Sequence, residues 1–445
     1  MSFPIEPAQV FRHFLNLQPT HWRRRRGSLG PQQVMLGLMT MTVLGCKGYE
    51  QTLGEMKVRL GRQLGWNQDE DVPSVSALCQ ARQKMDEHRC AALVSQVYAL
   101  CSTARACASL RYGGFRLLAE DGTKLALPAY KALRDHFGCP SQGVGRDMAG
   151  PQASLTVLWD VGANQPVDWR LGTYRTSEQE HARALAGSVG KGDLLLADRN
   201  FPSRRYLTQI HGRQAHVLMR IRAEGSGDLR EVTAFLAGSV TDVICEIGTR
   251  DERDRPLPGQ RTMSVRLVRA TLPDGSTAVY ITTLLDQHAH PAVVLVALYA
   301  QRWRIETAFR ELKIWHGLER FHARHVDGIA QEIAALMIFQ LLASELEAQA
   351  RQQHVEAQPP PPPEAESNAI QKPTIRFNRR IVADCTVNII YAAAMGEDIQ
   401  KALTSAFYRI WRYRQTVKSG RTFPRMRKSS HRGWKSRGST KKGKR

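Results

Sequence analysis

Apolar positions recur with a helical period in the first quarter of the chain. This spacing predicts helices over residues 34–44, 49–64 and 74–85. Ser74 stands at the start of the third helix, where its hydroxyl can cap free backbone N–H groups. We therefore expect residues 1–110 to form a helical N-terminal domain.

The pattern changes to strands after residue 110. Short apolar or alternating runs predict five strands (115–127, 153–161, 167–173, 193–197 and 215–221) and two helices (177–188 and 203–212). Their order is three strands, helix, strand, helix, strand, which predicts an α/β domain with a mixed sheet; we place it at residues 111–345. Within it, residues 222–285 are rich in Thr, Val, Gly and Asp and predict a β-rich insertion.

Long helical patterns follow this insertion. Residues 290–315 and 327–352 each predict one amphipathic helix. Five consecutive prolines at 359–363 mark a stiff, exposed linker. The linker, a helical C-terminal segment and a basic tail complete the expected organisation (346–373, 374–408 and 409–445).

The chain is strongly basic. Its 445 residues include 63 Lys and Arg against 41 Asp and Glu, a formal net charge of +22, which indicates nucleic acid or an anionic membrane as partner. Fifteen of the Lys and Arg, and no Asp or Glu, lie in the tail at 409–445. These groups can neutralise phosphates while the aromatic residues among them stack on bases. A tail that only improves solubility would have a similar composition.

Two further polar clusters are weaker indications of nucleic-acid binding. Four arginines at 23–26 could bind phosphate or form a solvated loop. A polar group on the helix expected at 74–85 could contact DNA or belong to an ordinary helix surface (Gln80, Arg82, Gln83 and Lys84).

The apolar segments predict no membrane span. The longest runs, at 34–46 and 333–343, are shorter than the ~20 residues that a spanning helix needs. The N-terminus lacks the basic and apolar regions of a signal peptide. The eight cysteines are scattered without a CxxC pair, which argues against the usual zinc spacings and for reduced thiols. We therefore expect a cytoplasmic protein that binds nucleic acid.

The stretch LYAQRWRIETAFRELK, at residues 298–313, carries the most informative polar side chains. On a helical wheel, four of them fall within an arc of about 60° beside the apolar stripe (Tyr299, Arg302, Glu306 and Lys313). Taken alone, Arg302 and Glu306 would be an ordinary i,i+4 pair worth about 0.2–0.5 kcal/mol on a solvated helix. The position of the four residues at the rim of the apolar stripe instead favours a cleft.

The spacing Y-x2-R-x3-E-x6-K of these residues resembles the Tyr-Arg-Glu-Lys signature of the insertion-sequence DDE transposases of bacteria. Asp121 in AEDGTKLALP and Asp198 in LLLADRNF are similar to the other two acidic motifs of that family. An Asp before Gly is also a common turn former, and an Asp after a strand is often only a cap. The similarity covers about residues 30–345, including the helix expected at 328–343, and the segment 421–428 also looks like the family.

The resemblance implies a ribonuclease H-like core in which Asp121, Asp198 and Glu306 are catalytic. In that family these carboxylates bind divalent cations, here expected to be two Mg²⁺ or Mn²⁺ ions. Such enzymes cut double-stranded DNA at transposon ends and join it to target DNA, with water and then a 3′-OH as nucleophile. The resemblance also implies a homodimer in the synaptic complex and a location on the bacterial nucleoid.

Phosphate-binding side chains are expected around the three carboxylates. Arg302 and Lys313 suit contacts near the scissile bond, and Tyr299 can hydrogen-bond or pack there. Arg220, on the strand after Asp198, is either a further phosphate contact or a plain surface arginine.

Two features depart from the family pattern. Asn200 stands where the family has Gly after Asp-Arg, and we expect the turn to survive because Asn tolerates a left-handed backbone. No Trp lies between residues 198 and 298, where some relatives use one to hold a flipped base during hairpin formation. Two other functions stay open: a catalytically degenerate DNA-binding regulator of transposition, and an RNA-processing nuclease on the same core.

Overall fold

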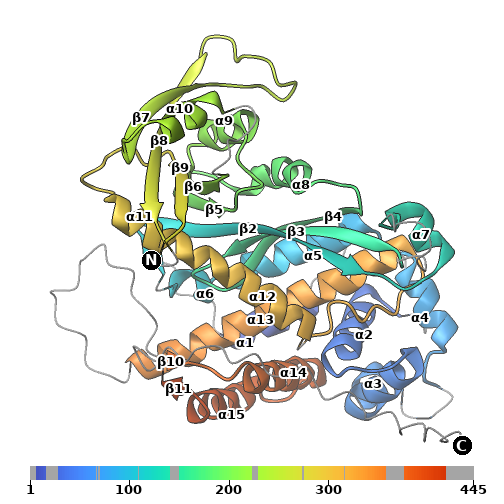
Figure 1. The fold of residues 1–445 in the computed structure, drawn as a ribbon. Helices are drawn as coiled ribbons and strands as arrows, with labels where there is room; N and C mark the ends of the chain where they lie inside the picture. Colours follow the sequence, from blue (N-terminus) through green and yellow to red (C-terminus); the bar gives the residue numbers. More distant parts are fainter. Residues whose placement is uncertain are drawn as a thin grey trace, which may run out of the picture.

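The computed structural model describes residues 7–16, 29–66, 68, 71–108, 110–140, 150–222, 229–272, 275–314, 316–356 and 375–416. The arginines at 23–26, the proline run at 359–363 and the tail beyond residue 416, for which the sequence made predictions, lie outside these residues. Within them, one large sheet crosses the molecule and helices lie on both of its faces (Figure 1).

This sheet has nine strands, in the order β4-β3-β2-β5-β6-β9-β8-β7 with β1 paired to β2. Strands β2, β3 and β4 are antiparallel neighbours, whereas β2, β5 and β6 run parallel. The strand bounds are β1 Arg111–Tyr112, β2 Phe115–Ala126, β3 Gln152–Asp160, β4 Gln165–Thr173, β5 Asp193–Ala197, β6 His216–Ile221, β7 Asp242–Gly248, β8 Thr262–Thr271 and β9 Thr277–Thr282; a separate pair is β10 Ile375–Arg376 with β11 Gln415–Thr416.

The centre of the sheet agrees with the sequence pattern. All five residues of β5, DLLLA, are buried between β2 and β6, as expected for a parallel strand that is covered on both faces. The five strands predicted between residues 115 and 221 are confirmed, with ends that differ by two residues at most. The prediction of an α/β fold with a mixed sheet is therefore confirmed.

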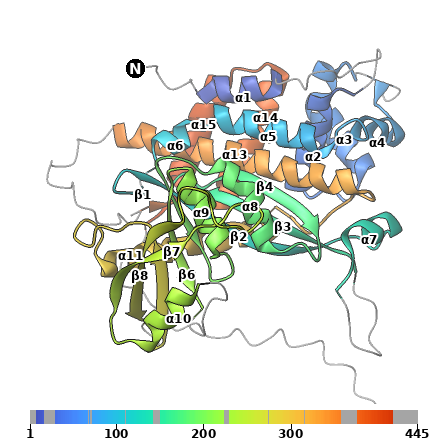
Figure 2. The same cartoon turned by 90° about the horizontal axis from the view of Figure 1, so that it is seen from above.

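The segment predicted as a β-rich insertion contains three strands, β7, β8 and β9. These strands do not form a sheet of their own, because β9 pairs antiparallel with β6 and so continues the main sheet. A helix that the pattern did not predict, α10, precedes β7. Figure 2 shows these strands at one end of the molecule, away from the N-terminal helices.

Helices pack on the two faces of the sheet around two hydrophobic cores. Side chains alternate along β2: Leu117 and Ala119 enter the larger core with α12 and α13, and Leu118 enters the smaller one with α8 and α9. The helix bounds are α1 Pro7–Asn16, α2 Pro31–Val43, α3 Tyr49–Leu64, α4 Val75–Arg82, α5 Glu87–Leu100, α6 Thr103–Ala106, α7 Lys131–Phe137, α8 Glu178–Leu185, α9 Arg204–Gly212, α10 Arg230–Ala237, α11 Ala292–Tyr299, α12 Trp303–Ile314, α13 Val326–Glu356, α14 Arg379–Met395 and α15 Ile399–Arg412, with 3₁₀ turns at Ala186–Ser188 and Ala300–Arg302.

The N-terminal helices share their core with the rest of the chain. The predicted helices correspond to α2, α3 and α4, and the Ser74 hydroxyl caps α4 by accepting a hydrogen bond from the backbone N–H of Ala77 at 3.1 Å. The long helix α13 packs against α2, α5 and α6 as well as against α14 and α15. The N-terminal and C-terminal helices therefore surround α13 and bury a single continuous core.

Helix α13 is also the one helix of the described residues that is long and apolar enough to cross a membrane. That stretch, Val326–His354, has a mean hydropathy of 1.5 over its most apolar window, and 89% of this window is buried inside the fold. The apolar run at 333–343 is shorter than this helix because Gln331 and Glu332 precede it and Ser344 and Glu345 follow it, yet all four are buried in the fold. Helix α13 is therefore a core helix.

The single helix predicted over residues 290–315 is wrong. A 3₁₀ turn at Ala300–Arg302 separates α11 from α12. Each 3₁₀ residue turns about 20° further than an α-helical residue, so Tyr299 is rotated relative to Glu306 from its place on the wheel. Arg302 ends the turn pointing inward, only 7% exposed, where it makes ion pairs that sequence spacing could not reveal.

Candidate active site

The register of the parallel strands brings the two predicted aspartates together. Strands β2 and β5 pair as far as Glu120 opposite Ala197. Asp121 and Asp198 follow one residue later, at the carboxyl end of β5. Strands β5 and β6 pair as far as Ala197 opposite Met219, so Arg220 of β6 follows one residue later, next to Asp198. Because neighbouring strands lie about 4.8 Å apart, the backbones of these three residues are adjacent.

Asp121 projects from the face of the sheet that α12 covers. The preceding side chain, Glu120, lies on the opposite face, where it accepts a hydrogen bond of 2.5 Å from the hydroxyl of Tyr206 on α9. Asp121 instead forms an ion pair with Arg302 at the end of the 3₁₀ turn. The backbone of Asp121 is paired with Val157 of β3, so the alternative in which Asp-Gly forms a turn is wrong.

The glycine after Asp121 is explained by a close contact. A Cβ atom at Gly122 would lie 2.4 Å from Oε1 and 2.8 Å from Cγ of Glu178, at the start of α8. A side chain at this position would force the Glu178 side chain to move away from β2. The Asp-Gly pair therefore has Arg302 on one face of the sheet and α8 on the other.

Arg302 connects two of the three predicted carboxylates. Its Nη2 lies 2.6 Å from Oε1 of Glu306, and its Nη1 lies 3.6 Å from Oδ2 of Asp121. Its Nε is buried without a hydrogen-bond partner. The guanidinium thus stands between β2 and α12 and places Glu306 on the same face of the sheet as Asp121.

The Asp121 carboxyl group holds its proton unusually tightly. Burial is the main cause, and it raises the pKa of Asp121 to about 7. The negative charges of Asp198 and Glu306 raise this pKa further, whereas Arg302 and the backbone N–H of Gly122, 3.0 Å from Oδ1, lower it. The carboxylates of Asp198 and of Glu306 are therefore each close enough to repel that of Asp121.

The other predicted residues lie around this group. Burial raises the pKa of Tyr299 to about 12; its ring packs edge-on against Tyr280 at 4.9 Å, and the Arg302 guanidinium carbon lies 5.8 Å from its centroid. Arg220 is half-buried and pairs in register with Tyr280, so it lies beside this tyrosine pair.

Lys313, near the end of α12, contacts β2 three residues beyond Asp121. Its Nζ donates to the backbone carbonyl of Lys124 and to Glu319, both at 3.0 Å. All four residues of the spaced signature therefore face the same side of the sheet, although the helix that carries them is broken.

The donor chemistry of the site suits a hard divalent cation. Carboxylate oxygens are the ligands that Mg²⁺ and Mn²⁺ prefer, and Asp121 and Glu306 both offer them around Arg302. Across the described ranges, however, no group of three or more His, Cys, Asp or Glu side chains already has a metal-binding arrangement, and all eight cysteines are free thiols. The carboxylates fit a cation if Arg302 moves from between Asp121 and Glu306.

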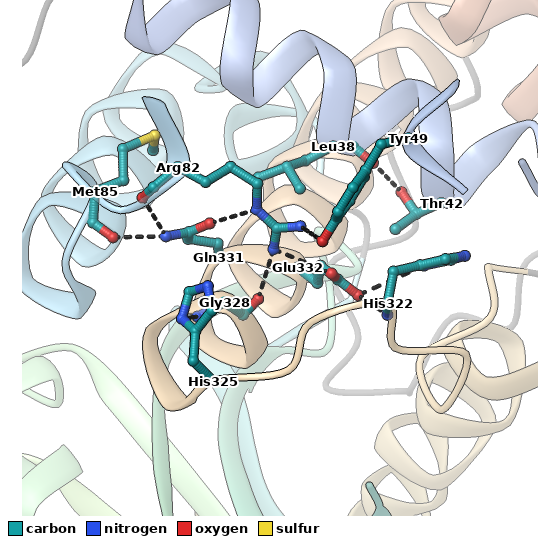
Figure 3. A network of polar contacts seen from close by, with 10 residues as sticks. All are labelled: Leu38, Thr42, Tyr49, Arg82, Met85, His322, His325, Gly328, Gln331 and Glu332. Carbon is teal, nitrogen blue, oxygen red and sulfur yellow. Dashed lines mark hydrogen bonds and ion pairs between the residues drawn. The ribbon is translucent and has the colours of Figure 1, made fainter. Parts of the chain in front are cut away.

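Two expectations about individual residues are corrected. Asn200 does not adopt a left-handed backbone: its N–H bonds Oδ1 of Asp198 at 2.8 Å, and this turn needs no positive φ. Arg82 does not face outward from α4 but is 1% exposed and pairs with Glu332 of α13 at 3.1 Å (Figure 3). Gln80, Gln83 and Lys84 of the same cluster are exposed.

Sequence reasoning missed two polar groups behind the site. Glu120 is fully buried, and burial raises its pKa to about 8. Glu178 and Arg222 both bond the side chain of Asn200. The alternation of β2 would have placed Glu120 inside, but nothing in the sequence indicated its partner on α9.

Comparison with known proteins identifies the segment that carries these residues. Residues 121–342 match the protein family described as the transposase DDE domain. The chain is also 23% identical, over 291 residues, to the transposase InsG for insertion sequence element IS4 of Escherichia coli (strain K12). That alignment covers 64% of this chain and 63% of the relative, so the chain spans less than two thirds of that protein.

A solved structure, the piggyBac transposase synaptic complex with hairpin DNA, is similar with a TM-score of 0.42 and 11% identity. The superposition covers 92% of this chain and 83% of that one, and its TM-score is too low to support an argument. The family match begins at Asp121 and includes Asp198 and Glu306. Residues 121–342 of this chain are therefore similar to transposase DDE domains.

Proposed function

We propose that this chain is the transposase of a bacterial insertion sequence, which binds terminal inverted repeats and catalyses metal-dependent cleavage and strand transfer of DNA. The observation that carries the proposal is the meeting of Asp121, Asp198 and Glu306 on one face of the sheet, inside the family segment. A ribonuclease H-like core belongs to the same proposal. Its support is a mixed sheet with one aspartate on β2 and another directly after the parallel strand β5.

In this proposal Asp121, Asp198 and Glu306 hold two Mg²⁺ or Mn²⁺ ions. When bound, such cations lower the pKa of the attacking water or 3′-OH and stabilise the oxygen that leaves phosphorus. Asp121 must release its proton and its contact with Arg302 to serve as a ligand. Substrate binding and cation binding then both favour the fully ionised carboxylates.

The cationic residues bind the phosphates. Arg302 can contact phosphate oxygens once its ion pair with Asp121 is broken, and Lys313 can contact them from α12. Arg220 can contact them from β6. Tyr299 restricts the Arg302 side chain by packing beside it. These groups bind and orient the DNA backbone, which supplies positioning rather than base recognition.

Double-stranded DNA, as transposon ends and as target, is the proposed partner, and the net charge of +22 supports it. A homodimer in the synaptic complex and a location on the nucleoid are part of the proposal. The alternative of a degenerate regulator is not favoured, because the three carboxylates and all four signature residues are present and Arg302 contacts both Asp121 and Glu306. The hypothesis of an RNA-processing nuclease differs from that of a transposase in the preferred substrate, which is structured RNA rather than DNA.

Cleavage of a duplex that carries the inverted repeats flanking the coding sequence tests the proposal. With Mg²⁺ or Mn²⁺, Asp121→Asn, Asp198→Asn and Glu306→Gln should each lose at least about a hundredfold in rate, the size expected when a group that stabilises charge in the transition state is removed. Asp384→Asn, which removes an exposed carboxylate of α14, should cleave like the wild type. Unchanged cleavage by the three variants would disprove the assignment, binding without any cleavage would favour the regulator, and preference for structured RNA would favour the RNA nuclease.

A further inference from the structure

The backbone N–H, the backbone carbonyl and both polar side-chain atoms of Asn200 all have hydrogen-bond partners. Its backbone N–H donates to Oδ1 of Asp198 at 2.8 Å, and its carbonyl accepts from Nε2 of Gln179 at 2.9 Å. Its side-chain Nδ2 donates to Oε2 of Glu178 at 3.3 Å, and its Oδ1 accepts from Nη2 of Arg222 at 2.8 Å. A half-buried turn residue with four partners on three elements is far more constrained than a surface loop requires.

These contacts join the two strand segments that bear the aspartates. Glu178, which receives the Asn200 amide, also packs directly on Gly122, the residue after Asp121. Asn200 itself is two residues after Asp198 and bonds its carboxylate. We call the Glu178–Asn200–Arg222 contacts the Asn200 bridge. The bridge therefore runs from the turn after β5 to the point where α8 rests on β2.

We propose that Asn200 is a positioning residue: through Glu178 it fixes the distance between the Asp121 and Asp198 carboxylates so that both can hold one cation. This inference rests on the proposed function. Glycine at position 200 would keep both backbone bonds but neither side-chain bond. The amide is suited to the position because it donates to a carboxylate and accepts from a guanidinium at the same time.

The test measures Mn²⁺ binding to the full-length protein, by the electron paramagnetic resonance signal of free Mn²⁺, and the Mn²⁺ dependence of DNA cleavage. Asn200→Ala and Asn200→Gly should bind Mn²⁺ about tenfold more weakly, the usual effect of removing a group that orients a ligand. Cleavage at saturating Mn²⁺ should fall much less than Mn²⁺ affinity does. Gln179→Ala, which removes only the bond to the Asn200 carbonyl, is the matched control and should bind like the wild type.

Substitutions at Glu178 show whether the bridge itself is responsible. Glu178→Gln keeps an oxygen acceptor for the Asn200 amide and should retain Mn²⁺ affinity, whereas Glu178→Ala should lose about tenfold. The double variant Asn200→Ala/Glu178→Ala should be no worse than either single one, because the two residues act through one contact. Additive losses would overturn the proposal.

The failure of this inference can be told from the failure of the proposed function. If the wild type binds Mn²⁺ more tightly than Asp198→Asn but Asn200→Ala and Asn200→Gly bind like the wild type, the bridge has no positioning role and the metal site stands. If the wild type binds no more tightly than Asp198→Asn, the metal site fails and the inference fails with it. Either glycine or alanine at position 200 decides the result, so poor folding of one variant leaves the other.

Discussion

Four arginines of the described residues are buried, and two of them, Arg82 and Arg302, have very different surroundings. Arg82 is 1% exposed and Arg302 is 7% exposed. Every nitrogen of the Arg82 guanidinium has an acceptor, as Figure 3 shows. The acceptors are Gln331 Oε1 at 2.8 Å, the Tyr49 hydroxyl at 2.5 Å, the Gly328 carbonyl at 3.1 Å and Glu332 Oε1 at 3.1 Å.

Arg302 has the opposite environment. It faces two carboxylates that are themselves partly exposed, 16% for Asp121 and 30% for Glu306, and its Nε has no partner. Burial is the main cause of the raised pKa of Asp121, and Arg302 lowers this pKa without cancelling the effect of burial. Saturated partners mark Arg82 as a structural link between α4 and α13, whereas Arg302 contacts carboxylates that water also reaches, as the proposed ligand site requires.

Substituting each arginine by methionine should give the largest difference between the two regions in the free energy of unfolding. Arg82→Met leaves Glu332 charged and buried at 1% exposure, so the free energy of unfolding should fall by about 3–5 kcal/mol. Arg302→Met should cost less than about 1 kcal/mol, because Asp121 can bind a proton and Glu306 can contact water. Urea unfolding at neutral pH measures both, and equal losses would contradict the distinction drawn here.

A second comparison concerns two buried carboxylates, one with an arginine and one without. Glu332 pairs with Arg82, but Glu120 has only the Tyr206 hydroxyl, and its Oε1 has no partner. The pKa of Glu120 is raised from 4.5 in the unfolded chain to about 8, so the folded state binds a proton that the unfolded state releases. Stability from this residue is therefore complete below about pH 4.5 and is lost as the pH rises toward 8.

Glu120→Gln should remove this pH dependence, because its amide oxygen can still accept from Tyr206 and it carries no charge. Between pH 5 and 8 the wild type should lose about 1.4 kcal/mol per pH unit relative to the variant. Denaturant unfolding at four pH values in this range provides the measurement. Parallel curves for the two proteins would mean that Glu120 is ionised in the fold and that an unidentified partner compensates its charge.

The contrast between these regions also explains what the sequence could predict. Asp121, Asp198 and Glu306 were found because their flanking residues or spacing resemble a family, and the buried strand DLLLA, directly before Asp198, added a local signal. The adjacency of Asp121 and Asp198 follows from the parallel pairing of β2 with β5, which the sequence pattern did not specify, and Glu306 comes from a helix.

Contacts between distant parts of the chain could not be predicted in this way. Arg82 looks like a surface residue of a short helix, because its acidic partner is 250 positions later in the chain. Arg302, which ends the 3₁₀ turn before α12, pairs with Asp121 on a strand about 180 positions earlier. The strands of the supposed insertion join the main sheet because β6 offers them an edge, and strand propensity alone does not specify which edge a strand will meet.

Substituting the tyrosines beside the two arginines by phenylalanine should give the smallest difference in the free energy of unfolding. Tyr49→Phe removes one of the acceptors of Arg82, and the loss of a single hydrogen bond should lower the free energy of unfolding by about 1 kcal/mol. Tyr299→Phe should lower it by less than about 0.5 kcal/mol, because Arg302 retains both carboxylates. The same Tyr299 variant should slow DNA cleavage, while Tyr49→Phe should not. Unfolding and cleavage measured on both variants check this, and a Tyr49 variant that is stable but slow would place Arg82 in the catalytic region after all.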